Sequence, residues 1–197
     1  MPPKKLLYVH GYGSSGNAHK ANLLRQMFPE YTLVAPTIDY NHELPAAIYG
    51  KLAQLVAGDT FSLIVGSSMG GFFSLCITHA TSTPVLAINP ATNPAAVLRK
   101  VATPAVLARA GVSEEQADAL LAAYQTFQRE VFDTIKPAPR QLSFALSTDD
   151  ETLGSHAYLE QLFPDYNRKV VLDNCGHTFQ RFAELKPDIE ALLLPPC

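Results

Sequence analysis

One serine of this chain lies in a pattern that could make it a nucleophile. Residues 66–70 read Gly-Ser-Ser-Met-Gly, which matches Gly-x-Ser-x-Gly with Ser68 at its centre. The pattern is typical of a sharp turn from a strand into a helix, where the flanking glycines avoid collisions between the two elements. Ser68 would then project above a sheet and could attack a carbonyl carbon. The alternative is a glycine-rich turn without chemistry.

A serine hydroxyl is a poor nucleophile at neutral pH, so Ser68 needs a general base, and the base needs an orienting carboxylate. In the fold that uses this turn, the chain order is serine, acid, histidine. His177 follows the last apolar run of the chain, in Asp-Asn-Cys-Gly-His, and is the base that we predict. His156 falls in a stretch with helical character, so we expect no role for it in the site.

Three acidic residues follow the apolar run at 142–146, namely Asp149, Asp150 and Glu151. We favour Asp150, because two residues of loop beyond Ser147 bring a carboxylate back across the end of the sheet. Asp149 is the alternative acid, and Glu151 stays open. The carboxylate that is used would set the tautomer of the histidine and stabilise the imidazolium. We expect the other acids to be solvated loop charges.

A glycine-rich loop at residues 10–16, His-Gly-Tyr-Gly-Ser-Ser-Gly, allows two interpretations. Its Gly-x-Gly-x-x-Gly spacing fits a dinucleotide site, with Asp39 available for a ribose hydroxyl. The helix that follows starts after the third glycine, however, whereas a dinucleotide site needs its helix to open within the motif. We therefore favour an oxyanion hole made by the backbone N–H groups of Tyr12 and Met69, and we expect no cofactor and no metal.

Short apolar runs alternate with stretches of helical periodicity along most of the chain. This alternation predicts an α/β fold, a three-layer α/β/α sandwich around a mostly parallel sheet of six strands, in a single domain over residues 1–197. The expected strands are 6–9, 31–35, 61–65, 84–88, 142–146 and 169–172, and the expected helices are 18–28, 44–56, 69–80, 157–163 and 187–194.

Residues 90–139 interrupt the alternation, because five prolines punctuate them and the segment is too long for a simple connection. Ser113 begins a capped helix that should reach about Phe127. An insertion after a central strand would lie over the carboxyl ends of the strands, where ligands bind in open α/β sheets. We therefore interpret the segment as a cap.

The composition excludes several classes of protein. Of the 197 residues, 47% are hydrophobic, which is enough for one core, and the net charge of −3 with scattered lysines and arginines disfavours a nucleic-acid partner. No apolar run is long enough to span a membrane, and the N-terminus does not resemble a signal sequence, so we expect a cytoplasmic protein. The three cysteines, Cys76, Cys175 and Cys197, form no Cys-x-x-Cys pair and are expected to be reduced. The sequence carries no signal of an oligomeric state.

Four segments together resemble the small bacterial YqiA-type esterases: residues 7–12, residues 65–71, residues 88–91 and the pair Gly176-His177. The resemblance implies a compact α/β-hydrolase that cleaves carboxylic esters or thioesters with a Ser-Asp-His triad. The usual Gly-Asp-Glu-x-Leu of that family reads Asp-Asp-Glu-Thr-Leu at 149–153, an alignment that favours Asp150. It also implies that residues 89–91 support the pocket from beneath.

Three functions are compatible with these residues. The first is hydrolysis of a small-molecule ester or thioester through an acyl-enzyme. The second is an acyltransferase or thioesterase that uses the same triad. The third is a noncatalytic binding protein that keeps the fold, because a fold alone does not establish an activity.

Overall fold

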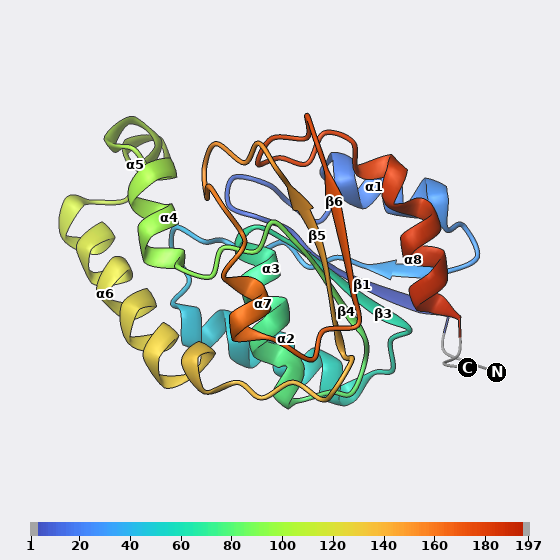
Figure 1. Cartoon of the computed structure of the whole chain (residues 1–197). Coiled ribbons are helices and arrows are strands. Elements are labelled where there is room, and N and C mark those ends of the chain that lie inside the picture. The colour runs from blue at the N-terminus through green and yellow to red at the C-terminus, as the bar shows by residue number, and fades with distance from the viewer. Residues whose placement is uncertain (1–3, 195–197) are drawn as a thin grey trace.

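A single six-stranded parallel sheet forms the centre of the protein, in the order β2-β1-β3-β4-β5-β6 (Figure 1). The computed structural model describes residues 4–194. Cys197, which we expect to be reduced, and the first three residues, which belong to the N-terminus that we expect not to be a signal sequence, lie outside this range. The strands are β1 (Lys5–Val9), β2 (Thr32–Val34), β3 (Leu63–Ser67), β4 (Val85–Ile88), β5 (Leu142–Ser147) and β6 (Arg168–Leu172). The predicted fold class and number of strands are confirmed.

Helices cover both faces of the sheet, because the strand side chains alternate between two apolar cores. Leu6 and Tyr8 of β1 pack on the side of the helices at 19–27 and 186–193, whereas Leu7 and Val9 pack on the side of the helices at 45–58 and 69–76. The helices of these two layers and the short helices beside them are α1 (His19–Met27), α2 (Pro45–Gly58), α3 (Met69–Cys76), α7 (Leu159–Leu162) and α8 (Lys186–Leu193), with 3-10 turns η1 (Ile77–His79), η2 (Phe132–Thr134) and η3 (Phe182–Leu185).

The chain leaves β1 toward one edge of the sheet to form β2, then returns to place β3 on the other side of β1. The carboxyl ends of β1 and β3 therefore border a topological switch point, where open α/β sheets bind ligands. The glycine loop follows β1 and Ser68 follows β3. Both candidate motifs thus meet at the place that the topology favours.

The segment at 90–139 contains three helices, α4 (Pro94–Val101), α5 (Pro104–Ala110) and α6 (Glu114–Glu130), which lie together at one side of the sheet (Figure 1). The predicted helix start is confirmed, because Ser113 and Gln116 form a capping box. Phe127 of α6 packs against Phe72 and Phe73 of α3, with ring centroids 6.1 and 6.0 Å apart. That this segment acts as a cap stays a prediction.

Two local predictions differ from the structure. The strand before Ser68 runs from Leu63 to Ser67, later than expected, because Gly66 and Ser67 pair with β4. The helix expected at 157–163 is limited to α7, the single turn Leu159–Leu162, and His156 lies in the loop before it. Among residues 4–194, no helix is long and apolar enough to cross a membrane.

Candidate active site

Ser68 occupies the turn between β3 and α3 in a strained conformation, with φ 54° and ψ −117°. A residue other than glycine is costly at such angles and persists only when its surroundings enforce them. Its N–H donates to the Ile88 carbonyl at 2.9 Å, and its carbonyl accepts from Phe72 and Ala91, both at 3.0 Å. These bonds to β4, α3 and the loop after β4 hold the serine at the carboxyl end of the sheet.

The glycines on either side of Ser68 are required by close backbone packing. A Cβ atom at Gly70 would lie 2.0 Å from the Val9 carbonyl oxygen, which belongs to the neighbouring strand. A Cβ atom at Gly66 would lie 2.2 Å from Ser74 Oγ and 2.5 Å from the Gly70 carbonyl oxygen. Only glycine lets the start of α3 approach the sheet this closely.

The structure brings Ser68, His177 and Asp150 together in one chain of contacts. Ser68 Oγ lies 2.8 Å from His177 Nε2, and His177 Nδ1 lies 3.0 Å from each carboxylate oxygen of Asp150. Because an ionised carboxylate only accepts hydrogen bonds, the ring proton of His177 is on Nδ1. The Nε2 lone pair therefore faces the serine hydroxyl, which is the arrangement of a general base.

Asp150 is held by more donors than the histidine alone. Its side chain is fully shielded from solvent, and Oδ1 also accepts from the N–H groups of Thr152 at 3.0 Å and Leu153 at 2.7 Å. Oδ2 accepts from His156 Nε2 at 3.1 Å. Burial alone would raise the pKa of Asp150, but the hydrogen bonds from His156, His177 and Leu153 outweigh it and hold this pKa well below its usual range.

The two neighbouring acids, Asp149 and Glu151, are solvent-exposed loop residues, as expected, but each also binds the backbone of the His177 loop. Asp149 Oδ1 accepts from Ser147 Oγ at 2.5 Å and from the N–H groups of Cys175 at 3.0 Å and Gly176 at 3.2 Å. Glu151 Oε2 accepts from the N–H of His177 at 2.8 Å. Both carboxylates bind the backbone that carries His177, and neither contacts its ring. Of the three acids, only Asp150 is placed to orient the imidazole.

Asn89 connects the loop of His177 to strand β5. Its Nδ2 donates to the carbonyls of Gly176 at 3.2 Å and His177 at 3.1 Å, and its Oδ1 accepts from the Ser147 N–H at 2.9 Å. The residue is completely buried and has a positive φ of 40°, which asparagine tolerates better than most side chains do. Asn89 therefore ties the His177 loop to the end of β5. That residues 89–91 support the pocket from beneath stays a prediction.

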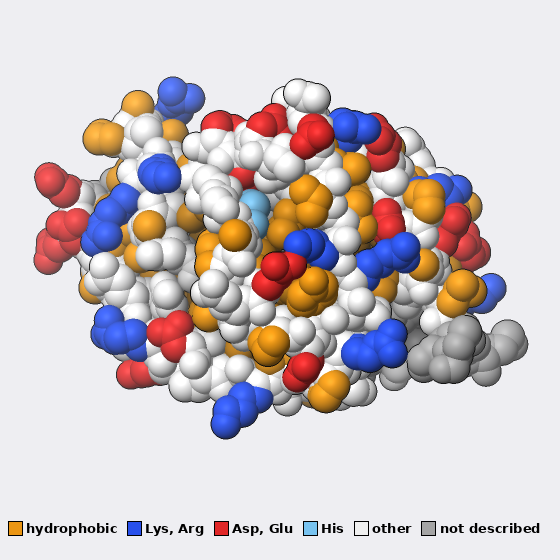
Figure 2. All heavy atoms as spheres, in the orientation of Figure 1, with side chains coloured by type: hydrophobic (Ala, Val, Ile, Leu, Met, Phe, Trp, Pro, Cys, Tyr) orange, Lys and Arg blue, Asp and Glu red, His pale blue; other side chains and the backbone are white. Residues whose placement is uncertain are grey.

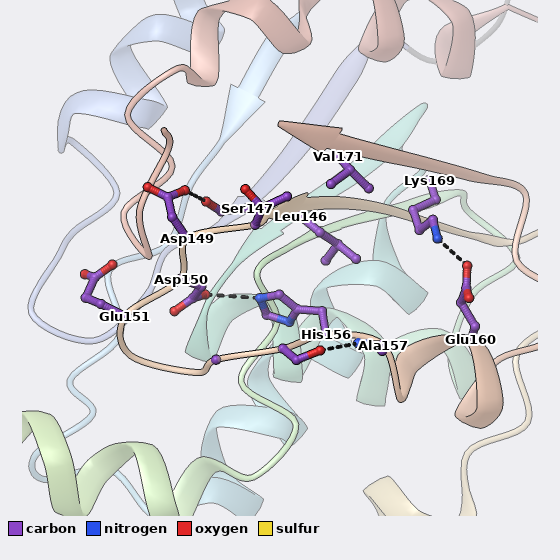
Figure 3. Close-up of a pocket in the computed structure, with 13 residues that line it drawn as sticks. Leu146, Ser147, Asp149, Asp150, Glu151, His156, Ala157, Glu160, Lys169 and Val171 are labelled. Atoms are coloured by element: carbon purple, nitrogen blue, oxygen red, sulfur yellow. Dashed lines mark hydrogen bonds and ion pairs between the residues drawn. The ribbon is translucent and has the colours of Figure 1, made fainter. Parts of the chain in front are cut away.

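His156 is the residue of the site that the sequence analysis missed. Its side chain is only 4% exposed, and Figure 3 places it beside Asp150, with its ring directed toward the carboxylate. Its other ring nitrogen, Nδ1, has no hydrogen-bond partner among the described residues. The only signal in the sequence was a histidine six positions after the acid, which does not distinguish a contact from an ordinary loop residue.

The loop after β1 lies against the serine, as the oxyanion interpretation needs. A Cβ atom placed on Gly11 would be 3.7 Å from Ser68 Oγ. No hydrogen bond from the backbone N–H groups of Tyr12 and Met69 is found within residues 4–194. That these two groups bind an oxyanion stays a prediction. The Tyr12 hydroxyl donates to Asn41 Oδ1 at 2.7 Å, which fixes the side chain of this residue.

His10 and Gly16 of the glycine loop have structural functions. His10 is fully buried; its Nε2 accepts from the Ile38 N–H at 2.9 Å, and its carbonyl accepts from the Tyr40 hydroxyl at 2.6 Å. Burial lowers the pKa of His10. A Cβ atom at Gly16 would lie 1.9 Å from the Ala35 carbonyl oxygen. Packing against the residue that follows β2 thus explains this glycine without a nucleotide.

Two cavities adjoin the loop that carries Asp150. One has a volume of about 630 Å³ and extends from the acid loop along β5 and β6 to Glu160 and Lys169 (Figure 3). The other, of about 400 Å³, lies between α4, α6 and the acid loop, with Thr92, Thr152 and Leu153 in its wall. On the face in Figure 2, basic and acidic side chains are interspersed and form no large patch of one sign.

Solved structures with similar folds come from several kinds of hydrolase. The esterase domain of a Rhodothermus marinus protein has a TM-score of 0.67 and 15% identity, with 96% of this chain and 86% of that one covered. A monoacylglycerol lipase of Paleococcus ferrophilus has a TM-score of 0.64 and 13% identity, with 98% and 95% covered. Epoxide hydrolases from metagenomes of hot environments have a TM-score of 0.65 and 17% identity, with 99% and 92% covered. At these identities, the likeness establishes the α/β-hydrolase fold.

The amino-acid sequence also matches a protein family over nearly its whole length. Residues 5–194 match the family described as "Uncharacterised protein family (UPF0227)". This range includes the glycine loop, the Ser68 turn, the acid loop and the His177 loop. The resemblance to the YqiA-type proteins is thereby confirmed, and the chain belongs to the UPF0227 (YqiA) family.

Proposed function

We propose that this protein is a serine hydrolase that cleaves carboxylic esters or thioesters through an acyl-enzyme. The observation that carries the proposal is the continuous contact from Ser68 Oγ to His177 Nε2 and from His177 Nδ1 to Asp150. This arrangement activates a hydroxyl and stabilises the imidazolium that forms. The esterase and lipase among the similar folds are consistent with it.

In the first half of the reaction, Ser68 Oγ attacks the carbonyl carbon while its proton passes to His177 Nε2. The Asp150 carboxylate, 3.0 Å from Nδ1, stabilises the resulting imidazolium. The carbonyl oxygen becomes an oxyanion that accepts from the Tyr12 and Met69 N–H groups. His177 then returns the proton to the departing alcohol or thiol, and the acyl group stays on Ser68.

In the second half, water takes the place of the alcohol. His177 Nε2 removes a proton from the water, whose oxygen attacks the acyl carbon, and the proton then returns to Ser68 Oγ as the carboxylic acid leaves. An acceptor other than water would give acyl transfer by the same steps. Because the same residues serve hydrolysis and acyl transfer, only the identity of the acceptor distinguishes the two reactions.

We further propose that part of the substrate occupies the cavity of about 400 Å³ beneath α4 and α6. Thr92 in its wall follows Ala91, whose N–H donates to the Ser68 carbonyl, and Leu153 in its wall donates its N–H to Asp150. Neither Ser68 nor Asp150 lines the cavity itself, but residues of its wall are bonded to Asp150 or follow a residue bonded to Ser68. In this proposal, the segment at 90–139 acts as a cap that closes over the acyl group or the leaving group.

A fluorophosphonate probe tests the catalytic proposal directly. We expect it to label the folded wild-type protein and to leave Ser68→Ala unlabelled. We also expect Asp150→Ala to lose far more esterase activity than Asp149→Ala, which removes bonds to the backbone of the His177 loop but no contact with the His177 ring. A folded wild-type protein that the probe does not label would sink the proposal, and loss of activity in Asp149→Ala alone would sink the choice of acid.

The substrate class requires a separate comparison. Hydrolysis of p-nitrophenyl esters of increasing chain length, measured beside acyl-CoA thioesters, gives the preferred acyl group and leaving group. Ala96 lines the cavity beneath α4, so Ala96→Phe should reduce the rate on long acyl esters more than the rate on acetate. An equal effect on all chain lengths would show that this cavity does not hold the acyl group.

A further inference from the structure

Asp150 is unusual in that two histidines donate to one carboxylate. His177 Nδ1 lies 3.0 Å from both oxygens, and His156 Nε2 lies 3.1 Å from Oδ2. The two rings come from different loops, since His177 follows β6 and His156 precedes α7. The proposed reaction uses only one of them.

The position of the His156 proton follows from its partner. A carboxylate oxygen only accepts, so the proton must be on His156 Nε2, and Nδ1 is left without a hydrogen-bond partner among the described residues. The ring is 4% exposed and stands in the wall of the cavity of about 630 Å³. It therefore directs a donor at Oδ2 from the wall of a cavity that Asp150 also lines.

We infer that His156 is a positioning residue for the proposed reaction: its Nε2–H holds Asp150 in the orientation that His177 needs. The bonds that hold Oδ1 come from the backbone N–H groups of Thr152 and Leu153. Of the donors other than His177, only His156 binds Oδ2 within the described residues. Without it, Oδ2 keeps only its contact with His177, and outside that contact the carboxylate is restrained against rotation about Cβ–Cγ only by the backbone bonds at Oδ1. The inference rests on the proposed function, because it assigns a residue to the same site.

Loss of this donor should also change the pH dependence of the reaction. The hydrogen bond from His156 favours the ionised carboxylate, so its removal makes the Asp150–His177 pair take up a proton more readily. The acid side of the pH profile should then move to higher pH. Other titratable groups that face the same region are Tyr158 and, around the cavity, Asp149, Glu151, Glu160 and Lys169; all of them stay unchanged in the variants below.

Two amide variants separate the effect of losing the hydrogen-bond donor from the effect of losing the bulk of the ring. In His156→Gln, the amide nitrogen can reach the position of Nε2, whereas in His156→Asn the shorter side chain reaches only the position of Nδ1. We expect His156→Asn to lower kcat about tenfold or more, with KM little changed, and to shift the acid limb upward by about half a pH unit or more. His156→Gln should retain most of the wild-type kcat and pH profile.

The outcomes separate this inference from the proposed function. If wild-type protein is not labelled by the fluorophosphonate probe, the proposed function fails before His156 is tested. If the wild type is active and the folded Asn and Gln variants behave alike, with an unmoved acid limb, His156 is merely structural and the inference is overturned.

A measurement on the wild-type protein covers the case in which His156→Asn does not fold. Long-range nitrogen–proton correlation NMR of the histidine rings identifies which nitrogen of His156 carries the proton. We expect the proton on Nε2. A proton on Nδ1 with a bare Nε2 would overturn the inference, because His156 could then donate nothing to Asp150.

Discussion

Replacing Asn89 with glycine tests whether one buried amide holds the two halves of the site together. Its side chain connects the Ser147 N–H at the end of β5 with two carbonyls of the His177 loop. Glycine removes all three hydrogen bonds and still adopts the positive φ of 40° without strain. The variant therefore isolates the side chain from the backbone conformation.

The expected loss of stability in Asn89→Gly follows from the number of these hydrogen bonds and from their burial. A typical intramolecular hydrogen bond contributes about 1 kcal/mol net, and a buried group left unpaired costs more. Asn89 and Ser147 are both buried, so little water can replace the amide. We expect Asn89→Gly to lower the free energy of unfolding by about 3 kcal/mol, and Asn89→Ala by about 1 kcal/mol more because of its positive φ.

Urea unfolding and ester hydrolysis measure the two consequences. The His177 loop should become less well positioned, so kcat should fall by roughly 10- to 100-fold, as expected for small displacements of a reacting group. Asn174→Gly is the matched control: it has a φ of 54° in the same loop, and its side chain bonds to no other described residue. A stability change below about 1 kcal/mol in Asn89→Gly would refute the reasoning.

Three further predictions address the turn, the acid and the reaction. Gly70→Ala should lower the free energy of unfolding by more than about 4 kcal/mol, because its Cβ would lie 2.0 Å from a backbone oxygen. Gly50→Ala is the control, because a Cβ atom there would lie in open space on α2, and it should raise the free energy of unfolding by about 0.5–1 kcal/mol. Equal changes of stability in the two variants, measured by urea unfolding, would contradict the steric argument. The lowered pKa of Asp150 means that its ionised form stabilises the fold above the unfolded pKa of about 3.9 and that this stabilisation is lost as pH falls toward the folded value. The stability gap between wild type and Asp150→Asn should thus be larger at neutral pH than at pH near 3; a gap independent of pH would contradict the shift. Ser68→Ala and His177→Ala should each lower kcat by up to roughly 10⁶-fold, since the groups act as a unit, and near-wild-type turnover in either folded variant would exclude the assigned role.

The three consecutive acidic residues of the acid loop have different partners. Asp149, Asp150 and Glu151 are adjacent, yet each binds a different part of the segment 175–177. The strand-like pattern of β5 predicts where the loop begins. It does not predict which way each side chain points after the strand ends, because the loop follows no regular period. The hydrogen bonds to the His177 loop determine those directions.

The sequence by itself determined the alternation of strands and helices, the turn at Ser68 and the order of serine, acid and histidine. These features depend on local periodicity and on glycines whose spacing is diagnostic of one kind of turn. Only the tertiary structure decided that α7 is a single turn, that Asn89 ties β5 to the His177 loop and that His156 binds Asp150. Each of these depends on residues far apart in the sequence or on an irregular loop, where a buried polar group takes the partner that the packed fold provides.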